Sequence, residues 1–219
     1  MIATESGDSY CGRSVLLTPG ATYRRLNVPG EDDLISAGIH ICATCDGPFY
    51  NGKELVVVSG VEEGLFLTKF ATKVTILEVG DRLRASQILQ EEAASHPQIE
   101  VRLDTTVVEF KGDEKLESLV IKDVNTEETE LMNPAAVFVF IGLLPNTGFV
   151  KDSVDLDQWE SITTSPTMET SLEGAFAEGD ARAGSTKQVT SAVGEGATAA
   201  LMIRQYLERT QGSRAYKGD

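Results

Sequence analysis

The residues most able to do chemistry in this chain are Cys42 and Cys45, which are separated by two residues and followed directly by Asp46. This spacing allows the two sulfurs to form a disulfide or to lie side by side as a dithiol. Exchange between a dithiol and a disulfide needs one thiolate to attack and another to leave, so protons must move in step. A neighbouring carboxylate can accept and return such a proton. We therefore predict a redox-active pair with Asp46 as its acid–base partner, although Asp46 is also a common residue at the start of an Asp-Gly-Pro turn.

The same spacing is compatible with a structural zinc ion or with two inert core cysteines. A closed zinc site needs four ligands, and the only histidines are His40 and His96. The third cysteine, Cys11, stands apart, and there is no second C-x-x-C. A set made of His40, Cys42 and Cys45 would lack a fourth ligand. Redox chemistry is therefore favoured, and we predict no metal site.

A second candidate site follows a short apolar stretch that ends on Gly179 and Asp180. Taken alone, these two residues are typical of an ordinary turn at the end of a strand. The segment 189–209 that follows is predicted to be a long helix. Its first turns consist almost entirely of small residues: Ser191, Ala192, Gly194, Gly196, Ala197, Ala199 and Ala200. Such a surface permits the close approach of another backbone or of a flat ligand.

These residues need a scaffold, and the sequence predicts an α/β fold. Three apolar, β-branched segments are typical of parallel strands that are covered on both faces: Glu54–Val58, Lys73–Leu77 and residues 137–141. Between the first two, the apolar residues of 61–71 recur at helical spacing, which completes a βαβ unit. A short strand is also predicted within 174–180.

The remaining segments are predicted to extend this sheet. Residues 81–95 have the pattern of an amphipathic helix. Residues 100–110 and Leu116–Asp123 alternate apolar and polar side chains, so we predict antiparallel strands joined by a turn at 111–113. The segment 142–148 is rich in turn residues, and we predict a loop that marks a domain boundary.

The composition excludes several classes of partner. Hydrophobic residues make up 41% of the 219 residues and charged residues 24%, which is typical of a globular protein. The 34 acidic residues outnumber the 19 basic ones, so the net charge of -15 argues against a nucleic-acid partner. The apolar runs are too short to cross a membrane, and no signal-peptide pattern is present, so we expect a cytoplasmic protein.

Residues 42–50, Cys-Ala-Thr-Cys-Asp-Gly-Pro-Phe-Tyr, with Gly-Lys-Glu-Leu-Val-Val-Val at 52–58, closely resemble the low-molecular-weight thioredoxin reductases. The resemblance continues through most of the chain, including 66–70, 138–142 and 176–189. It implies two Rossmann-like nucleotide-binding domains, one inserted in the other. Residues 27–141 would form an NADPH-type domain that carries the cysteines. Residues 1–26 and 142–219 would form an FAD-type domain.

The resemblance also implies a role for each candidate residue. In this family FAD passes electrons from NADPH to the cysteine pair, which reduces thioredoxin. Cys45 would face the flavin, Cys42 would attack the partner's disulfide, and Asp46 would be the acid–base residue. The residues implied in FAD binding are Gly179, Asp180, Lys187, Gln188 and Val189. Family members are usually homodimers, so we expect a homodimer.

Three departures from the family pattern modify these expectations. The G-x-G-x-x-G loop that receives the FAD diphosphate is not in this sequence, so the FAD site is incomplete. After Val58 the chain continues as Ser59-Gly60, which makes this loop about five residues shorter than the family's second glycine-rich loop. Glu78 follows the next strand, where the family has basic residues for the 2′-phosphate of NADPH. The last two departures affect one ligand, so we predict that the chain does not use NADPH directly.

The leading prediction is a flavin-linked disulfide oxidoreductase that exchanges with a thioredoxin-like partner. Its electrons would come from another donor, such as ferredoxin or a flavoprotein. The alternative is a non-catalytic or truncated relative that retains the fold as a binding or regulatory module.

Overall fold

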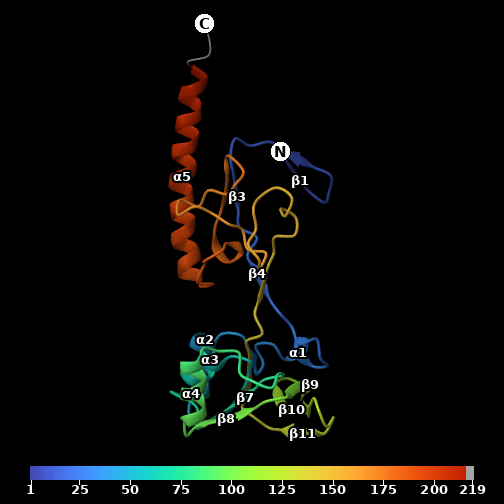
Figure 1. Cartoon of the computed structure of the whole chain (residues 1–219). Helices are drawn as coiled ribbons and strands as arrows, with labels where there is room; N and C mark the ends of the chain where they lie inside the picture. Colours follow the sequence, from blue (N-terminus) through green and yellow to red (C-terminus); the bar gives the residue numbers. More distant parts are fainter. Residues whose placement is uncertain (216–219) are drawn as a thin grey trace. The chain divides into compact units, whose positions relative to one another are not determined.

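The computed structural model describes residues 1–215, with side chains to residue 210, and the chain divides into two compact units (Figure 1). One unit comprises Met1–Thr22 together with the chain from Leu143 onward, and the other comprises Tyr23–Gly142. The NADPH-type domain predicted for residues 27–141 and the FAD-type domain predicted for the rest of the chain stay predictions.

The unit of residues 23–142 is built on a parallel five-stranded sheet with the strand order β5-β12-β6-β7-β8. The strands are β5 (Ile39–His40), β12 (Ala136–Val139), β6 (Glu54–Val58), β7 (Lys73–Leu77) and β8 (Ile99–Arg102). The predicted bounds of β6 and β7 are confirmed. Both strands are buried on both faces, so each continuous apolar run in the sequence begins and ends with its strand. The third predicted strand ends at Val139 rather than at residue 141.

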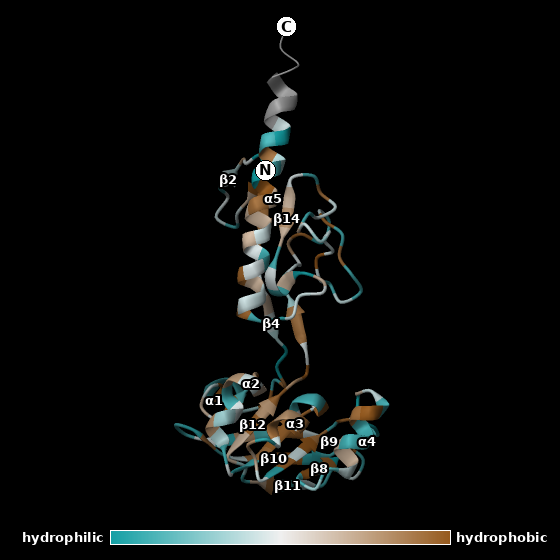
Figure 2. Cartoon of the chain, turned by 90° about the vertical axis from the view of Figure 1, so that its left-hand side faces the viewer, coloured by the Kyte–Doolittle hydropathy of each residue, from teal (hydrophilic) through white to brown (hydrophobic). Residues whose placement is uncertain are grey.

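Two hydrophobic clusters cover the two faces of this sheet. On one face, α3 (Val61–Leu67) and α4 (Gln87–Ser95) pack over strand residues such as Val57 and Phe138. The hydrophobic colouring of β12 in Figure 2 reflects a strand whose residues all belong to one or the other of the two clusters. On the other face, Val56 and Val137 pack against a second sheet.

Both helices are shorter than predicted, for local reasons. The Ser86 hydroxyl accepts a hydrogen bond from the Leu89 amide and so begins α4 at residue 87, whereas residues 81–86 are irregular. α3 ends at Leu67, and the amide of Phe70 donates to the Leu67 carbonyl in the turn that follows.

The second sheet is antiparallel, with the order β11-β10-β9. It comprises β9 (Thr105–Gly112), β10 (Leu116–Asp123) and β11 (Thr129–Met132). The prediction of one strand over 100–110 is wrong, because this segment contributes to both sheets. Its first part is β8, parallel to β7, and its second part is β9, antiparallel to β10. Asp104 lies between them with φ 50°, a left-handed conformation that redirects the chain without interrupting the alternation of the sequence.

The other unit contains short strands and one long helix. β3 (Val15–Leu17) pairs in parallel with β14 (Ala175–Ala177). β4 (Ala21–Tyr23) pairs with β13 (Leu143–Pro145), so part of the predicted loop over 142–148 is a strand. A small hairpin is formed by β1 (Ile2–Ala3) and β2 (Ser9–Tyr10). The 3-10 helix η2 (Gly179–Ala181) follows β14, and α5 (Val189–Ala215) completes the described chain.

Within residues 1–215, no helix combines the length and the apolar character needed to span a membrane.

The turn before α1 (Glu31–Leu34) requires glycine at position 30. Gly30 has φ 80°, and a methyl group there would lie 2.2 Å from the carbonyl oxygen of Phe110. We expect Gly30→Ala to lower the free energy of unfolding by roughly 2 to 3 kcal/mol in urea titrations, because strained backbone and steric overlap add. Gly52→Ala is the matched control, since Gly52 has φ 72° but open space around it. The control should lose only about 1 kcal/mol, and equal losses would contradict a steric requirement at position 30.

Candidate active site

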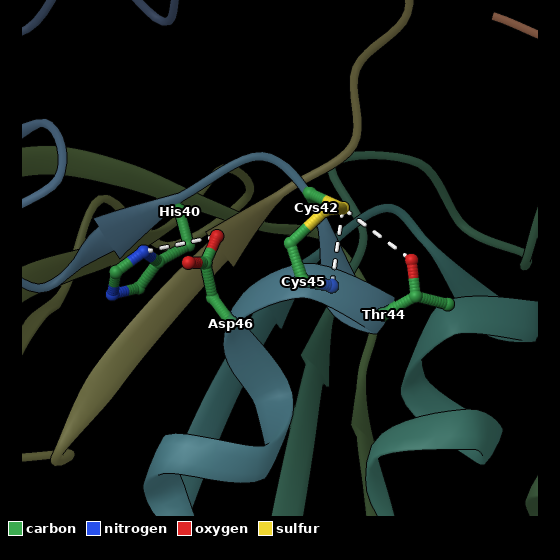
Figure 3. The surroundings of a disulfide bond; sticks show 5 residues. All are labelled: His40, Cys42, Thr44, Cys45 and Asp46. Atoms are coloured by element: carbon green, nitrogen blue, oxygen red, sulfur yellow. Dashed lines mark hydrogen bonds and ion pairs between the residues drawn. A yellow bond between two sulfur atoms is a disulfide. The ribbon is translucent and has the colours of Figure 1, made fainter. Parts of the chain in front are cut away.

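The cysteine pair lies where β5 leaves the parallel sheet. Cys42 has an extended backbone and caps α2 (Ala43–Asp46), which runs directly into the 3-10 helix η1 (Gly47–Tyr50). One helical turn therefore brings Cys45 back to Cys42, and the two form a disulfide with their Cα atoms 5.3 Å apart (Figure 3). The predicted pairing of Cys42 with Cys45 is confirmed.

The turn that carries the disulfide is held tightly against the core. A methyl group at Gly47 would lie 2.7 Å from Cδ2 of Leu67, a fully buried residue of α3. A side chain at position 47 would therefore force Leu67 to shift. The disulfide is therefore fixed to the edge of the sheet and to α3 rather than carried by a free loop.

The two sulfurs have different surroundings. The Cys42 sulfur accepts a hydrogen bond from the Cys45 amide at 3.2 Å and lies 3.4 Å from the Thr44 hydroxyl. Such donors would stabilise a thiolate on Cys42 once the disulfide is open. Cys45 is the more exposed residue, whereas Cys42 is half-buried.

Asp46 lies beside this pair and faces a histidine. Its carboxylate oxygen Oδ2 is 3.4 Å from Nδ1 of His40, the last residue of β5 (Figure 3). The other ring nitrogen of His40, Nε2, is 2.6 Å from the hydroxyl of Tyr50. The His40 side chain is only 10% exposed and that of Asp46 is 30% exposed. The zinc set of His40, Cys42 and Cys45 is not formed, because the imidazole turns toward Asp46 and Tyr50.

Sequence reasoning missed His40 and Tyr50 as neighbours of Asp46. One signal was available: His40 precedes Cys42 by two positions, and alternate residues of an extended segment share a face. Tyr50 gave no comparable signal, because only the packing of η1 brings its hydroxyl to the imidazole.

Burial sets the protonation states of His40 and Tyr50. Burial lowers the pKa of His40 below 6.5, and the opposing attraction of Asp46 does not offset it. Burial, together with the charge of Asp46, raises the pKa of Tyr50 above 10.0. At neutral pH the site therefore contains a neutral imidazole and a protonated phenol.

The predicted flavin-binding residues lie in the other unit, where Gly179, Asp180 and Lys187 come together. Gly179 begins η2 with φ 73°, and its amide donates to a carboxylate oxygen of Glu195 in α5 at 2.9 Å. The ammonium group of Lys187 donates to the carbonyl oxygen of Asp180. Gln188 and Val189 stand at the exposed start of α5.

These residues fit a flavin nucleotide in part. The first amides of α5, a 27-residue helix, have no acceptor within the helix and carry the positive end of its dipole, which suits an anionic ligand group. The Gly179 amide does not fit a diphosphate, because Glu195 already accepts its hydrogen bond and is itself paired with Arg182. The roles of all five predicted residues stay predictions.

Glu178 lies next to this cluster and is unfavourable as a charged group. Among the described residues its oxygen Oε2 is buried without a hydrogen-bond partner. Burial raises the pKa of Glu178, and the charges of Glu195 and Asp180 raise it further. A carboxyl whose pKa is higher in the folded state contributes stability at low pH, and this contribution is lost as the pH rises through the folded-state pKa.

We therefore expect Glu178→Gln to raise the melting temperature by about 2 °C near neutral pH. The gain should fade below pH 4.5, the ordinary pKa of the group, where the carboxyl is protonated in both states. Thermal unfolding followed by circular dichroism across this range measures the effect. Glu173→Gln, at an exposed neighbouring position, is the control and should change little. A Glu178→Gln protein that is less stable than the parent at neutral pH would show that the charged form is well accommodated.

The turn between β6 and α3 does not fit a dinucleotide diphosphate. Ser59 has φ 71° and Gly60 leads straight into α3, whose first turn contains Glu62 and Glu63. A methyl group at Gly60 would lie 2.5 Å from the ring of Phe140 and 2.8 Å from a carboxylate oxygen of Glu63. The Phe140 ring and the Glu63 carboxylate therefore pack closely against this turn, and the charge of Glu63 would oppose a phosphate group there.

Glu78 lies differently from the sequence-based expectation. It is 1% exposed, so it does not present its charge to solvent. Its carboxylate accepts hydrogen bonds from the Ser59 hydroxyl at 3.2 Å and from the Gly80 amide at 3.4 Å. Glu78 thus ties the end of β7 to the short turn after β6.

Comparisons with known proteins identify the family of the chain. Residues 2–196 match the family model described as pyridine nucleotide-disulphide oxidoreductase. The chain belongs to this family. It is 39% identical over 214 residues to a thioredoxin reductase from Treponema pallidum (strain Nichols), which covers 96% of this chain and 69% of the relative.

Solved structures of thioredoxin reductases have the same fold. The enzyme from Streptococcus pyogenes MGAS5005 superposes with a TM-score of 0.83 at 40% identity over 90% of this chain and 66% of that one. The enzyme from Giardia duodenalis gives a TM-score of 0.84 at 33% identity over 94% and 69% of the two chains. This member of the family thus spans about two thirds of the length of these relatives. The α/β fold and the resemblance to thioredoxin reductases are confirmed.

Proposed function

We propose that the chain is a disulfide oxidoreductase of the thioredoxin-reductase type, in which Cys42 and Cys45 exchange with the disulfide of a thioredoxin-like protein. The observation that carries the proposal is the Cys42–Cys45 disulfide, with Asp46 as the next residue of the same helical turn (Figure 3). The similarity to thioredoxin reductases over nearly the whole chain supports the class of partner.

The first step begins from the reduced pair. The Cys42 thiolate attacks one sulfur of the partner's disulfide, so a mixed disulfide forms and the partner's own disulfide bond breaks. The partner's leaving sulfur departs as a thiolate and takes up a proton. The amide of Cys45 and the hydroxyl of Thr44 support this assignment, because they would stabilise the attacking thiolate on Cys42.

In the second step Cys45 loses its proton to Asp46 and attacks the Cys42 sulfur. The Cys42–Cys45 bond forms, the mixed disulfide breaks, and the second partner sulfur leaves as a thiolate that is then protonated. The partner gains two electrons and two protons, and the pair of the chain is oxidised. Asp46 gives its proton to the partner's leaving thiolate and is an ionised carboxylate again for the next cycle.

The pair must then be reduced again. FAD, when bound, would supply the two electrons for this step. Asp180, Lys187, Gln188 and Val189 are the residues that would hold it, through the start of α5 and the adjoining η2. Cys45, the more exposed cysteine, would face the flavin. A homodimer follows only from the family resemblance and a cytoplasmic location only from the sequence pattern, and both stay predictions.

The electron donor is proposed to be other than NADPH. The occupied turn at Gly60 and the carboxylate of Glu63 support this, because both would oppose a diphosphate. Ferredoxin or another flavoprotein would then supply the electrons. Titration calorimetry with NADPH should give no saturable signal up to about 1 mM, the upper end of ordinary substrate affinities. Micromolar binding would overturn this part of the proposal.

A single-turnover experiment tests the proposed exchange without any electron donor. The chain is reduced with dithiothreitol, freed of it, and mixed with an oxidised thioredoxin, and the thiols of both proteins are then counted by alkylation and mass spectrometry. We expect one thioredoxin disulfide to be reduced for each Cys42–Cys45 pair that is oxidised. If neither thioredoxin nor a small disulfide oxidises the pair, the chain is better described as a binding or regulatory relative.

A further inference from the structure

Beyond the two cysteines and Asp46, the site contains a histidine that no part of the proposed reaction uses. We infer that His40 is a positioning residue for proton transfer at Asp46, with its Nδ1–H directed at the carboxylate and its Nε2 held by the Tyr50 hydroxyl. This inference rests on the proposed disulfide exchange and adds two residues, His40 and Tyr50, to the group that performs it.

The His40 ring lies between Asp46 and Tyr50 and contacts each of them through one ring nitrogen. Oδ2 of Asp46 lies 3.4 Å from Nδ1 of His40, and the Tyr50 hydroxyl lies 2.6 Å from Nε2. The three residues come from β5, α2 and η1, which the chain folds back on one another around the disulfide. Phe138 of β12 lies against the imidazole with a distance of 5.2 Å between ring centroids, and so fixes the plane of the ring.

The contacts select one tautomer of the imidazole. If Nδ1 carries the proton, it can donate toward Asp46 while Nε2 accepts from the Tyr50 hydroxyl. The other neutral tautomer would point a lone pair of Nδ1 at a carboxylate, which is repulsive. Only the first tautomer satisfies both neighbours, in the way that a carboxylate fixes the tautomer of a catalytic histidine in hydrolases.

The protonation of the group agrees with this arrangement. Among the described residues, the titratable groups that face His40 are Asp46 from α2 and Tyr50 from η1, whereas β12 presents only an apolar ring. Burial lowers the pKa of His40, so the ring is neutral at neutral pH and has one proton to place. Burial raises the pKa of Tyr50, so its hydroxyl keeps the proton that it donates to Nε2.

The arrangement has a consequence for Asp46. A carboxylate that is 30% exposed would otherwise rotate freely between solvent and the disulfide. A donor held by Tyr50 and Phe138 restricts the carboxylate to one orientation next to Cys45, its neighbour in the chain, and this restriction is what the proton transfer would use. His40 thus contributes by positioning the Asp46 carboxylate, and it does not change the chemistry of the cysteines.

The tautomer can be read directly in the full chain. Long-range proton–nitrogen NMR spectra distinguish a protonated from an unprotonated ring nitrogen, and the chain has only two histidines, so His96→Gln assigns the signals. At neutral pH we expect His40 to carry its proton on Nδ1 alone. Tyr50→Phe should leave His40 neutral but shift the Nε2 signal. A proton on Nε2, or on both nitrogens, would overturn the inference whatever the activity of the chain.

A pH profile tests the role in proton transfer. The reduced chain is oxidised with hydroxyethyl disulfide, a small probe that needs neither flavin nor thioredoxin. We expect His40→Phe, which keeps a ring against Phe138, to react about tenfold more slowly near neutral pH. The difference should disappear about one unit above the ordinary thiol pKa, where the thiols ionise unaided. A deficit of the same size at every pH would indicate only structural damage and would contradict the inference.

A double-mutant cycle tests whether His40 acts through Asp46. In an Asp46→Asn background, His40→Phe should have no further effect, because the group that it positions has lost its acid–base function. An additive effect would show that His40 acts independently of Asp46. These outcomes are distinguishable from a failure of the proposed function, since a chain that reacts normally with the small disulfide but not with thioredoxin would contradict the choice of partner alone.

Discussion

The Cys45→Ser chain is expected to accumulate a mixed disulfide with an oxidised thioredoxin and to release no reduced thioredoxin. Cys42 can still attack the partner, but the serine hydroxyl cannot attack the Cys42 sulfur to resolve the complex. Loss of an attacking group commonly costs several powers of ten, so release should fall by about 10³-fold or more. Non-reducing electrophoresis and the mass of the complex measure the trapped species.

The Cys42→Ser chain is the discriminating control. Exposure alone favours Cys45 as the attacking residue, whereas the hydrogen bond from the Cys45 amide and the nearby Thr44 hydroxyl favour Cys42. We expect little trapped complex from Cys42→Ser and normal exchange from Cys11→Ser. If Cys42→Ser traps thioredoxin more efficiently than Cys45→Ser, the two roles are reversed.

The second large effect is expected for Phe138→Ala, which should lower the free energy of unfolding by about 3 to 5 kcal/mol. Phe138 is 0% exposed on β12, between β5 and β6 of the parallel sheet. Its ring centroid lies 5.2 Å from that of His40 and 6.1 Å from that of Tyr50. Truncation therefore leaves a cavity beneath the group that faces Asp46, and the surrounding strands can close it only in part.

Phe49→Ala is the matched control for this change. Phe49 lies in η1 of the same unit, three residues after Asp46, but it is 82% exposed. Its truncation should change stability by less than about 0.5 kcal/mol. Equilibrium unfolding in urea, with the slope compared between variants, measures both. Similar losses from the two substitutions would contradict the assignment of Phe138 to the core beneath the site.

Two strands of the parallel sheet, β6 and β7, were the most predictable part of the fold. β6 and β7 are buried on both faces, so their apolar runs begin and end where the strands do. The division between β8 and β9 could not be read in the same way, because alternation continues through the left-handed residue at Asp104. β13 was hidden by its turn-rich sequence and exists because β4 offers it a partner.

In the candidate site, too, some residues could be predicted from the sequence and some contacts could not. Cys42, Cys45 and Asp46 are contiguous enough for spacing alone to indicate their chemistry. Tyr50 reaches Nε2 of His40 only after α2 and η1 have reversed the chain, so no local pattern predicts the contact. Glu78 was identified as an unfavourable neighbour for a phosphate, but its burial against Ser59 depends on how closely β6 and β7 lie. The contact between Glu195 and the Gly179 amide likewise depends on tertiary packing.

The central claim is that Cys42 and Cys45 form a reversible redox pair, and a thiol count across a redox titration tests it most directly. The full chain is equilibrated in mixtures of reduced and oxidised dithiothreitol, quenched in acid, alkylated and weighed by mass spectrometry. We predict one transition in which two thiols disappear together, while Cys11, the exposed free cysteine, stays modified throughout. A chain that keeps three modifiable thiols, or only one, in every mixture would show that the pair does not exchange electrons, and the proposed oxidoreductase function would be wrong.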